Sequence, residues 1–293
     1  MNNNTKTSFK DKWEKNIDLA FKETVREGSD IQNWIINRNG WKNLFDFREY
    51  LKDKTNILDA GCGNGRVTAL LRENTDPKKC KIVGVDLVAA EVAGNNLVKY
   101  KNVVAHQKDL LGDLKDLGKF DFIYSQEVLH HTNDPFAAFK NLVVNSLQDK
   151  GTIAIYVYKK KAILREYCDD FIRDKIKGMS YEESIKVCDQ IAELGKSLTE
   201  QNVKITVPSV DVLGIEKGEY DIQRFIYHFF MKCFWTDKMS FNENSVINYD
   251  WYHPQNCERY EVEEIRDWFN NLNLKITHEF VDHYGITMHG VKR

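Results

Sequence analysis

The sequence predicts an α/β protein with a mostly parallel sheet, helices on both faces and a helical insertion after the fifth strand. Three observations support this fold class. Strand-like apolar segments alternate with amphipathic helical segments between residues 45 and 158, which is the pattern of parallel strands covered by helices. A glycine-rich turn follows the first of these strands. Near the C-terminus, two more strand-like segments are joined by a connection too short for a helical crossover, so they must be antiparallel.

Five strand-like segments form the predicted parallel part of the sheet. Each is short and rich in apolar or β-branched residues, and polar residues stand at the ends of the first four. Because the carboxyl ends of parallel strands meet at one edge, these residues define one crevice, the usual ligand site of an open parallel sheet. The segments lie at residues 57–58, 81–87, 103–107, 120–125 and 152–158.

The turn after the first strand combines a carboxylate with three glycines. Asp59 follows the apolar residues of the strand, and Gly61, Gly63 and Gly65 then alternate with small or polar residues before a helix begins. Glycines at this spacing allow a positive φ and a close approach of ligand to backbone, although a simple tight turn is the alternative. A carboxylate here would repel a pyrophosphate at the helix N-terminus. It would attract a ligand that carries an ammonium and a sulfonium group.

Acidic residues also stand at the ends of the second and third strands. Asp86 follows Gly65 by about 20 positions, the spacing at which an acidic side chain reaches a ribose diol. The same residue is suited to cap a helix over residues 87–100. Asp109 follows the third strand in a stretch that is equally typical of a turn. Both carboxylates therefore carry a ligand hypothesis and a structural one.

With these motifs, the chain resembles the class I S-adenosylmethionine-dependent methyltransferases, in the branch that acts on small molecules. The resemblance covers roughly residues 45–158 and resumes near 251–292. It implies a Rossmann-like, seven-stranded, mostly parallel sheet with a terminal antiparallel hairpin. It also implies S-adenosylmethionine as cofactor, with S-adenosylhomocysteine as product. The motifs that carry it are residues 58–65, 84–86, 108–110 and 125–131, the last leading into a helix that Asp134 caps and Pro135 begins.

The resemblance also implies which residues hold the cofactor. The glycine loop and the carboxylate before it would bind the amino-acid end, an acidic residue the ribose, and the end of the third strand the adenine. A glutamine at the end of the fourth strand would lie beside the sulfonium. Residue by residue, the cofactor contacts implied are Asp59, Gly61, Cys62, Gly63, Asp86, Leu87, Asp109, Leu110 and Gln126.

The chain is predicted to divide into four stretches: an N-terminal helical cap at 1–44, an α/β core at 45–158, a helical insert at 159–249 and a closing segment at 250–293. In the cap, Phe9, Trp13 and Ile17 recur at helical spacing, and related enzymes suggest a lid. Helices in the insert are expected near 161–177, 180–199 and 219–233. An insertion after the fifth strand suits substrate recognition, with a stabilising appendage or a dimer surface as alternatives. The closing segment is expected to hold a helix at 260–272 and strands at 275–281 and 286–291.

The composition limits the possible partners and compartments. The 42 basic and 44 acidic residues nearly cancel, which argues against a dominant nucleic-acid footprint. The six cysteines show neither a CxxC pair nor zinc spacing, as expected in a reducing cytoplasm. The first residues are polar, so no signal peptide is expected, and no window approaches the length of a membrane span. A cytoplasmic protein is predicted, and a homodimer is possible.

Transfer of a methyl group to an alcohol or phenol would need a proton acceptor, and histidine suits this role near neutral pH. His131 follows the fourth strand, where its neighbour His130 is better suited to packing. His253 belongs to the segment Asp250–Pro254, which resembles a segment of an uncharacterised methyltransferase group. An anchored turn is the alternative role for this segment. The candidate catalytic residues are therefore His131 and His253, and the candidate substrate-binding residues are Tyr158, Tyr227, Trp251 and Tyr252.

These residues predict a methyltransferase that acts on a small or medium-sized metabolite, with O-methylation favoured and a sugar or secondary metabolite as examples. No carboxylate cluster suggests a metal site. An RNA-modifying methyltransferase is the alternative enzyme, with residues 159–161 and the insert as phosphate contacts. A non-catalytic cofactor-binding regulatory or scaffold protein is the alternative of another class. An NAD-dependent oxidoreductase is the remaining possibility.

Overall fold

The computed structural model describes residues 3–293, with side chains from residue 4 onward; the first two residues of the predicted cap lie outside this range. The described chain forms two compact units. The first comprises Trp13–Lys159 and Glu258–Arg293, and the second comprises residues 3–12 and Lys160–Cys257. The boundary between Lys12 and Trp13 falls within helix α1 (Asn3–Lys15), so this helix contributes to both units.

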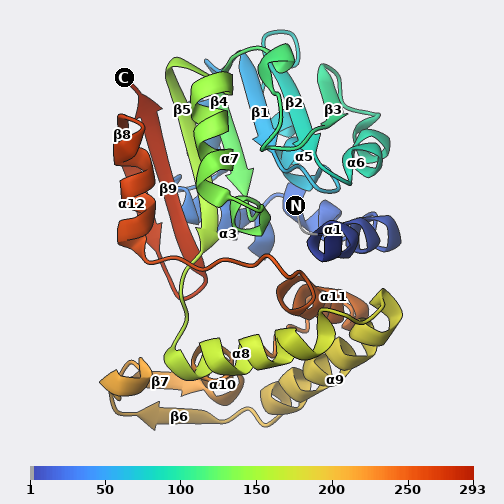
Figure 1. Ribbon diagram of the computed structural model, residues 1–293, viewed down its shortest axis with the longest axis vertical. Helices are drawn as coiled ribbons and strands as arrows, with labels where there is room; N and C mark the ends of the chain where they lie inside the picture. The colour runs from blue at the N-terminus through green and yellow to red at the C-terminus, as the bar shows by residue number, and fades with distance from the viewer. Residues whose placement is uncertain (1–2) are drawn as a thin grey trace. The chain divides into compact units, whose positions relative to one another are not determined.

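The predicted sheet is confirmed. Within the described residues of the first unit, seven strands form one sheet in the order β3-β2-β1-β4-β5-β9-β8 (Figure 1). The first five strands run parallel, whereas β9 is antiparallel to both β5 and β8. The terminal hairpin is thus present as expected. The strands are β1 (Asn56–Ala60), β2 (Lys81–Asp86), β3 (Val103–Gln107), β4 (Phe120–Gln126), β5 (Leu147–Tyr158), β8 (Leu274–Val281) and β9 (Gly285–Lys292).

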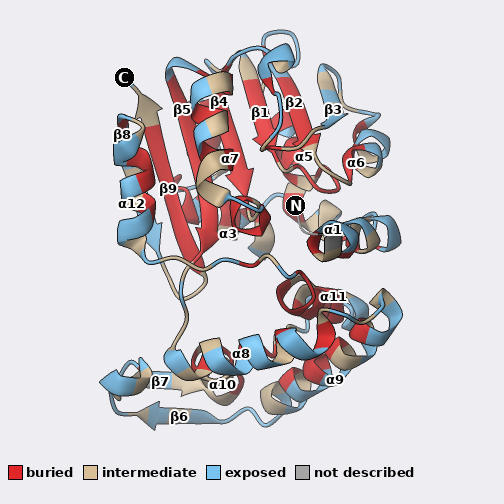
Figure 2. Cartoon of the chain, viewed as in Figure 1, coloured by how far each residue is buried: buried red, intermediate tan, exposed pale blue. Residues whose placement is uncertain are grey.

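Helices cover both faces of this sheet. They are α2 (Phe21–Val25), α3 (Asp30–Arg38), α4 (Leu44–Leu51), α5 (Arg66–Glu73), α6 (Ala90–Leu97), α7 (Pro135–Asn141) and α12 (Val262–Asn271). Alternate residues of each strand point to opposite faces, and two hydrophobic clusters form accordingly. Leu58, Ile123 and Ile153 pack with α7 and α12. Their neighbours Ile57, Phe122 and Ala154 pack with α3, α4 and α5. The central strands are accordingly buried along their length (Figure 2).

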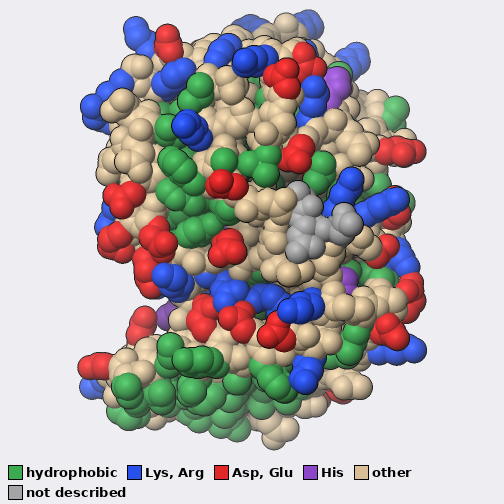
Figure 3. All heavy atoms as spheres, in the orientation of Figure 1, with side chains coloured by type: hydrophobic (Ala, Val, Ile, Leu, Met, Phe, Trp, Pro, Cys, Tyr) green, Lys and Arg blue, Asp and Glu red, His purple; other side chains and the backbone are tan. Residues whose placement is uncertain are grey.

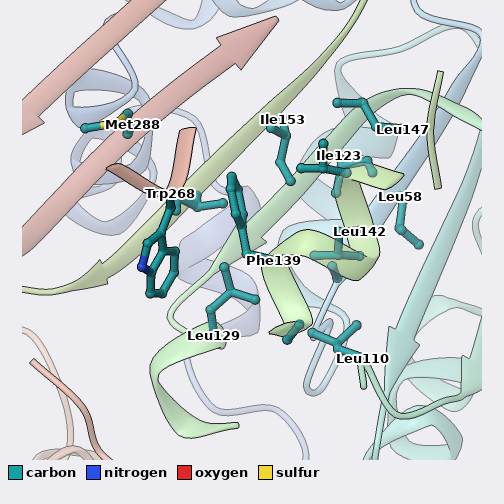
Figure 4. Close-up of a cluster of buried hydrophobic side chains, with 14 of the residues drawn as sticks. Leu58, Leu110, Ile123, Leu129, Phe139, Leu142, Leu147, Ile153, Trp268 and Met288 are labelled. Atoms are coloured by element: carbon teal, nitrogen blue, oxygen red, sulfur yellow. The ribbon is translucent and has the colours of Figure 1, made fainter. Parts of the chain in front are cut away.

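The cluster beneath α7 and α12 is built around aromatic side chains (Figure 4). Phe139 of α7 lies 5.7 Å from Trp268 and 4.9 Å from Phe269, measured between ring centroids. Asp134 caps α7 by accepting a hydrogen bond from the backbone N–H of Ala137 at 2.9 Å, and Pro135 occupies the first helical position. Such a cap satisfies a backbone donor that the helix cannot use. The predicted start of this helix is confirmed.

The second unit is helical, with one small hairpin. It contains α8 (Ile163–Ile176), α9 (Tyr181–Glu200), β6 (Lys204–Val207), β7 (Gly218–Asp221), α10 (Ile222–Phe229) and α11 (Phe241–Tyr252). Three of these helices were expected. The β6–β7 hairpin and helix α11 were not, because two four-residue strands and a helix with polar residues on all sides leave little periodic signal. Side chains of Ile163, Tyr167 and Phe171 form an exposed apolar stripe along α8, in a region where Figure 3 shows hydrophobic side chains gathered.

Candidate functional site

The glycine loop lies at the carboxyl edge of the sheet, between β1 and α5. Gly61, Gly63 and Gly65 all have positive φ, the region in which a side chain is unfavourable. A Cβ at Gly61 would lie 2.3 Å from the side chain of Val128, and one at Gly63 would lie 2.7 Å from the indole of Trp13. Both the positive φ and the lack of space for a Cβ therefore require glycine at these positions.

The segment after α1 lies against this loop. The side-chain amide of Asn64 donates hydrogen bonds to the carbonyls of Ile17 and Leu19 at 3.2 and 3.1 Å. The amide of Asn96, on α6, donates to Ile17 and to Asn64 at 2.7 and 2.9 Å. These contacts attach residues 13–19 to the candidate cofactor site. The sequence did not single out Asn64 for this role, although its place inside the glycine loop was a usable signal.

Asp59 is buried inside β1, one strand position before the loop. Its carboxylate accepts a hydrogen bond from the hydroxyl of Thr68 on α5 at 2.6 Å. Burial raises the pKa of Asp59 to about 7, which the Thr68 hydrogen bond only partly offsets. A carboxylate in this state gains from a positively charged ligand, because such a ligand would stabilise the ionised form.

Asp86, at the end of β2, already has backbone partners. Its Oδ1 accepts hydrogen bonds from the N–H groups of Val88 and Ala89, each at 2.9 Å, and its Oδ2 accepts one from Gly63 at 3.0 Å. Asp86 therefore ties the glycine loop to the turn before α6, close to the capping role considered from sequence, while remaining partly exposed. Leu87, next in the chain, is likewise partly exposed.

At the end of β3, Asp109 organises a turn by accepting a hydrogen bond from the N–H of Leu111 at 2.9 Å. Leu110 is buried in the cluster beneath α7, and its carbonyl accepts a hydrogen bond from Asn141 at 2.7 Å. The turn role weighed for Asp109 is thus present. A contact with adenine remains a prediction for both residues.

Two residues at the end of β4 complete the edge. Gln126 is the last residue of the strand and is 6% exposed. Glu127 follows with a φ of +60°, a left-handed conformation that is strained for a residue with a side chain. Its carboxylate pairs with Arg66 of α5 at 3.3 Å. The sequence carries no local signal for this pair, because the contact joins residues from two separate elements.

The remaining predicted site residues fall into two groups. In the first unit, His131 and Tyr158 are both buried, with ring centroids 5.7 Å apart, and His130 packs on Tyr158 at 3.8 Å. The packing role expected for His130 fits this contact. The structure therefore brings His131, which follows β4, together with Tyr158, the last residue of β5.

The other group lies in the second unit. Trp251 and Tyr252 donate hydrogen bonds to the carboxylate of Asp169 at 2.8 and 2.7 Å, while the guanidinium of Arg165 lies 4.5 Å from the Tyr227 ring. His253 is buried beside Ser8, with its Nδ1 2.7 Å from the hydroxyl, and its Nε2 lies 3.0 Å from the Met179 carbonyl. Burial lowers the pKa of His253. The predicted roles of these four residues in substrate binding and catalysis remain predictions.

Neither a metal cluster nor a membrane span is evident in the part of the chain that the structure describes. Residues 3–293 contain no group of three histidine, cysteine or acidic side chains arranged to hold a metal ion. Over the same residues, no helix combines the length and apolar character needed to cross a bilayer.

Comparisons with known proteins agree on one family. A family model described as a methyltransferase domain matches residues 34–189. The ribosomal protein L11 methyltransferase of Ruminiclostridium cellulolyticum is 26% identical over 145 residues, covering 48% of this chain and 39% of that protein. The juvenile hormone acid O-methyltransferase of Bombyx mori is 29% identical over 150 residues, covering 46% and 48%. The chain thus matches less than half the length of these relatives. The structure of the N-methyltransferase NodS from Bradyrhizobium japonicum, with S-adenosyl-l-homocysteine, has a TM-score of 0.44 at 12% identity and covers 98% of both chains.

Proposed function

This chain belongs to the methyltransferase-domain family, and from that premise we propose that it transfers a methyl group from S-adenosylmethionine to an oxygen atom of a small or medium-sized metabolite. Membership of the family confirms the resemblance seen in the sequence. The observation that carries the proposal is Asp59, a buried carboxylate with a pKa raised to about 7 beside a glycine loop. The amino-acid end of S-adenosylmethionine brings an ammonium group, which suits such a carboxylate. A pyrophosphate would be repelled.

The residues at the sheet edge fit this cofactor. Gly61 and Gly63 give the loop its positive-φ conformation, Asp86 is partly exposed where a ribose would lie, and Gln126 offers an amide at the end of β4. When bound, S-adenosylmethionine supplies a methyl group on a positively charged sulfur. The protein then has to hold the acceptor in line and exclude water. Val128 and Trp13, which lie over Gly61 and Gly63, would contribute to the second task.

O-methylation is favoured over other acceptors by one relative, whose name describes methylation of an acid at oxygen. Methylation of a protein, as the name of the other relative describes, is the alternative that the comparisons add.

A reducing compartment such as the cytoplasm suits the chain, because none of its six cysteines forms a disulfide within the described residues.

Calorimetric titration with S-adenosylmethionine and S-adenosylhomocysteine tests the cofactor. Both are expected to bind, and Asp59→Asn is expected to weaken each by at least roughly tenfold, about 1.4 kcal/mol. Asp121→Asn is the matched control, because Asp121 lies near the opposite end of β4 and accepts hydrogen bonds from Thr55 at 2.6 and 2.9 Å. The Asp121→Asn variant should bind both compounds as tightly as the wild-type protein does. Failure of both compounds to bind wild-type protein, with NAD binding instead, would exclude the proposal.

We also propose His131 and His253 as alternative proton acceptors for a hydroxyl substrate. If His131 serves, His131→Asn should lower kcat with little change in KM and remove the acidic limb of the pH profile. His253→Asn is the paired variant. A rate that neither substitution changes at any pH would exclude both residues as the base.

A further inference from the structure

Two buried donor atoms near the end of β4 lack hydrogen-bond partners within residues 3–293: Nη1 of Arg38 and Nε2 of Gln126. Arg38, the last residue of α3, is 1% exposed and Gln126 is 6% exposed. Leaving such a donor unpaired in the protein interior is unfavourable, and more so for a charged group. Two of them in one region therefore suggest a ligand that accepts hydrogen bonds.

The guanidinium of Arg38 is fixed on its other sides. Its Nε donates to the hydroxyl of Thr287 at 2.9 Å, and its Nη2 pairs with Asp282 at 3.3 Å. The group lies 4.1 Å from the ring centroid of Trp34 and 3.9 Å from that of Tyr156. Stacking and hydrogen bonds thus set the plane of the fork, and Nη1 is the donor position left over.

The orientation of the Gln126 amide follows from a chain of hydrogen bonds that starts at β9. Burial lowers the pKa of His289 to about 3, so its ring is neutral, and Nε2 lies 2.8 Å from Oδ1 of Asn39. The Nδ2 of Asn39 then donates to the hydroxyl of Tyr124 at 3.0 Å, and this hydroxyl donates to Oε1 of Gln126 at 2.6 Å. Because Oε1 is used as the acceptor, Nε2 must point the other way as a donor.

Strand register places both donors on the same face of the sheet. Gln126 of β4 pairs with Tyr156 of β5, and Tyr156 pairs with Thr287 of β9. Neighbouring strands lie roughly 4.8 Å apart, so Arg38, which stacks on Tyr156, stands about two strand spacings from the glycine loop that follows β1. The Arg38 donor thus lies two strands away from the loop that would hold the amino-acid end of the cofactor.

The acidic side chains near these two donors leave Nη1 of Arg38 available to an anion. The carboxylate of Glu127 is paired with Arg66 at 3.3 Å, and Asp282 occupies only the Nη2 side of Arg38. Asp86, which points to the same face, accepts hydrogen bonds from backbone N–H groups, and Asp59 lies opposite Tyr124 in the β1–β4 ladder. Its place under the proposed function is beside the cofactor ammonium.

We infer that Arg38 and Gln126 form an oxyanion subsite that binds a carboxylate of the methyl acceptor. A guanidinium and an amide donor suit the two oxygens of a carboxylate. The inference rests on the proposed function, and it narrows the substrate class to metabolites that carry a carboxylic acid. It gives Tyr124, Asn39 and His289 positioning roles, since they orient the Gln126 amide without touching the ligand.

The test is calorimetric titration of protein saturated with S-adenosylhomocysteine. The probes are hexanoate, decanoate and phenylacetate, each compared with the primary amide of the same skeleton. At least one acid is expected to bind tenfold or more tightly than its amide. Gln126→Glu keeps the acceptor for Tyr124 but replaces the free donor with a negative oxygen, so it should abolish this preference. Arg38→Lys, which keeps the charge but loses the fork, should reduce it at least fivefold.

Asp282→Asn is the control, because it changes the partner of Nη2 and leaves Nη1 in place; it should keep the preference for the acid. Circular dichroism and S-adenosylhomocysteine affinity show whether each variant is folded. Equal binding of acid and amide across the three pairs would overturn the inference while leaving cofactor binding, and with it the proposed function, intact. Variants that lose S-adenosylhomocysteine affinity but keep the acid preference would overturn it too, since the donors would then serve the cofactor carboxylate.

Discussion

Each unit of this protein buries an aspartate that is 1% exposed, and the two carboxylates differ in how far the fold satisfies them. Asp169, in the second unit, accepts four hydrogen bonds: from Nε of Arg165 at 3.1 Å, Nε1 of Trp251 at 2.8 Å, the hydroxyl of Tyr252 at 2.7 Å and the N–H of Lys232 at 2.9 Å. These partners come from α8, α11 and the chain between α10 and α11. Asp169 therefore joins the elements of the second unit.

Asp59, in the first unit, relies on one residue. The hydroxyl and backbone of Thr68 are its hydrogen-bonding partners, and burial raises its pKa to about 7. A carboxylate that the fold fully satisfies stabilises the fold, whereas one that the fold leaves short of partners has capacity for a ligand. The difference separates a structural cluster from a candidate binding site.

Asp169→Ala should destabilise the second unit by about 3–5 kcal/mol, because it leaves the buried Arg165 guanidinium without its charge partner. Urea denaturation measures the loss. Hydrogen exchange should show it in α8 and α11 before the strands of the first unit. Asp170→Asn is the control. The Asp170 side chain is about half exposed in its pair with Arg173, so this variant should lower the free energy of unfolding by less than about 1 kcal/mol. Comparable losses for the two variants would remove the structural role assigned to Asp169.

In unliganded protein at pH 8, Asp59→Asn should raise the free energy of unfolding, which is the opposite of the effect expected for Asp169→Ala. The pKa of Asp59 is raised from 3.8 to about 7 on folding, so the folded state holds a proton that the unfolded state loses between these values. Stability from this group is present at low pH and is lost as pH rises towards 7. The uncharged asparagine should therefore stabilise the protein by roughly 1–4 kcal/mol at pH 8 and much less at pH 4. Thermal denaturation at both pH values measures this. A destabilised variant at pH 8 would show that Asp59 belongs to the same class as Asp169.

The affinity for S-adenosylhomocysteine should rise with pH by up to about tenfold per unit between pH 5.5 and 7, and then level off. The cofactor ammonium requires the ionised carboxylate, so binding at low pH must first release the proton from Asp59. Titration calorimetry in buffers of different ionisation enthalpy detects that proton. Asp59→Asn should flatten the profile; a profile that keeps its slope in this variant would assign the titration to another group.

Tyr124→Phe should lower the free energy of unfolding by about 1–2 kcal/mol, since it removes the hydroxyl that links the buried amides of Asn39 and Gln126. It should also weaken the preference for acids over amides, because the Gln126 amide would be free to turn. Tyr100→Phe is the control, in which an exposed hydrogen bond to Glu73 is lost, and its effect should stay within about 0.5 kcal/mol. Denaturation curves for the two variants are the measurement. Equal effects would show that the chain from His289 to Gln126 does not constrain the amide.

Local signals in the sequence predicted most of the first unit. Short segments rich in apolar and β-branched residues located the five parallel strands and the terminal hairpin, and Asp134 with Pro135 located the start of α7. In the second unit the same approach found three helices but neither α11 nor the β6–β7 hairpin. Helix α11 presents asparagines and aromatic residues that are satisfied by long-range contacts, such as Asn248 with the backbone of Phe234, so its pattern carries no amphipathic period.

The sequence by itself determined the fold class and the glycine loop with its preceding carboxylate, because apolar strand segments, glycine spacing and the order of motifs are properties of neighbouring residues. Only the tertiary structure decided how far each buried polar group is satisfied. Arg38 of α3, His289 of β9 and the β4 pair of Tyr124 and Gln126 are far apart in the chain. Strand register and helix packing connect His289 to Tyr124 and Gln126 by hydrogen bonds that pass through Asn39. They also stack Arg38 on Tyr156. No local pattern encodes which of these donors remains without a partner.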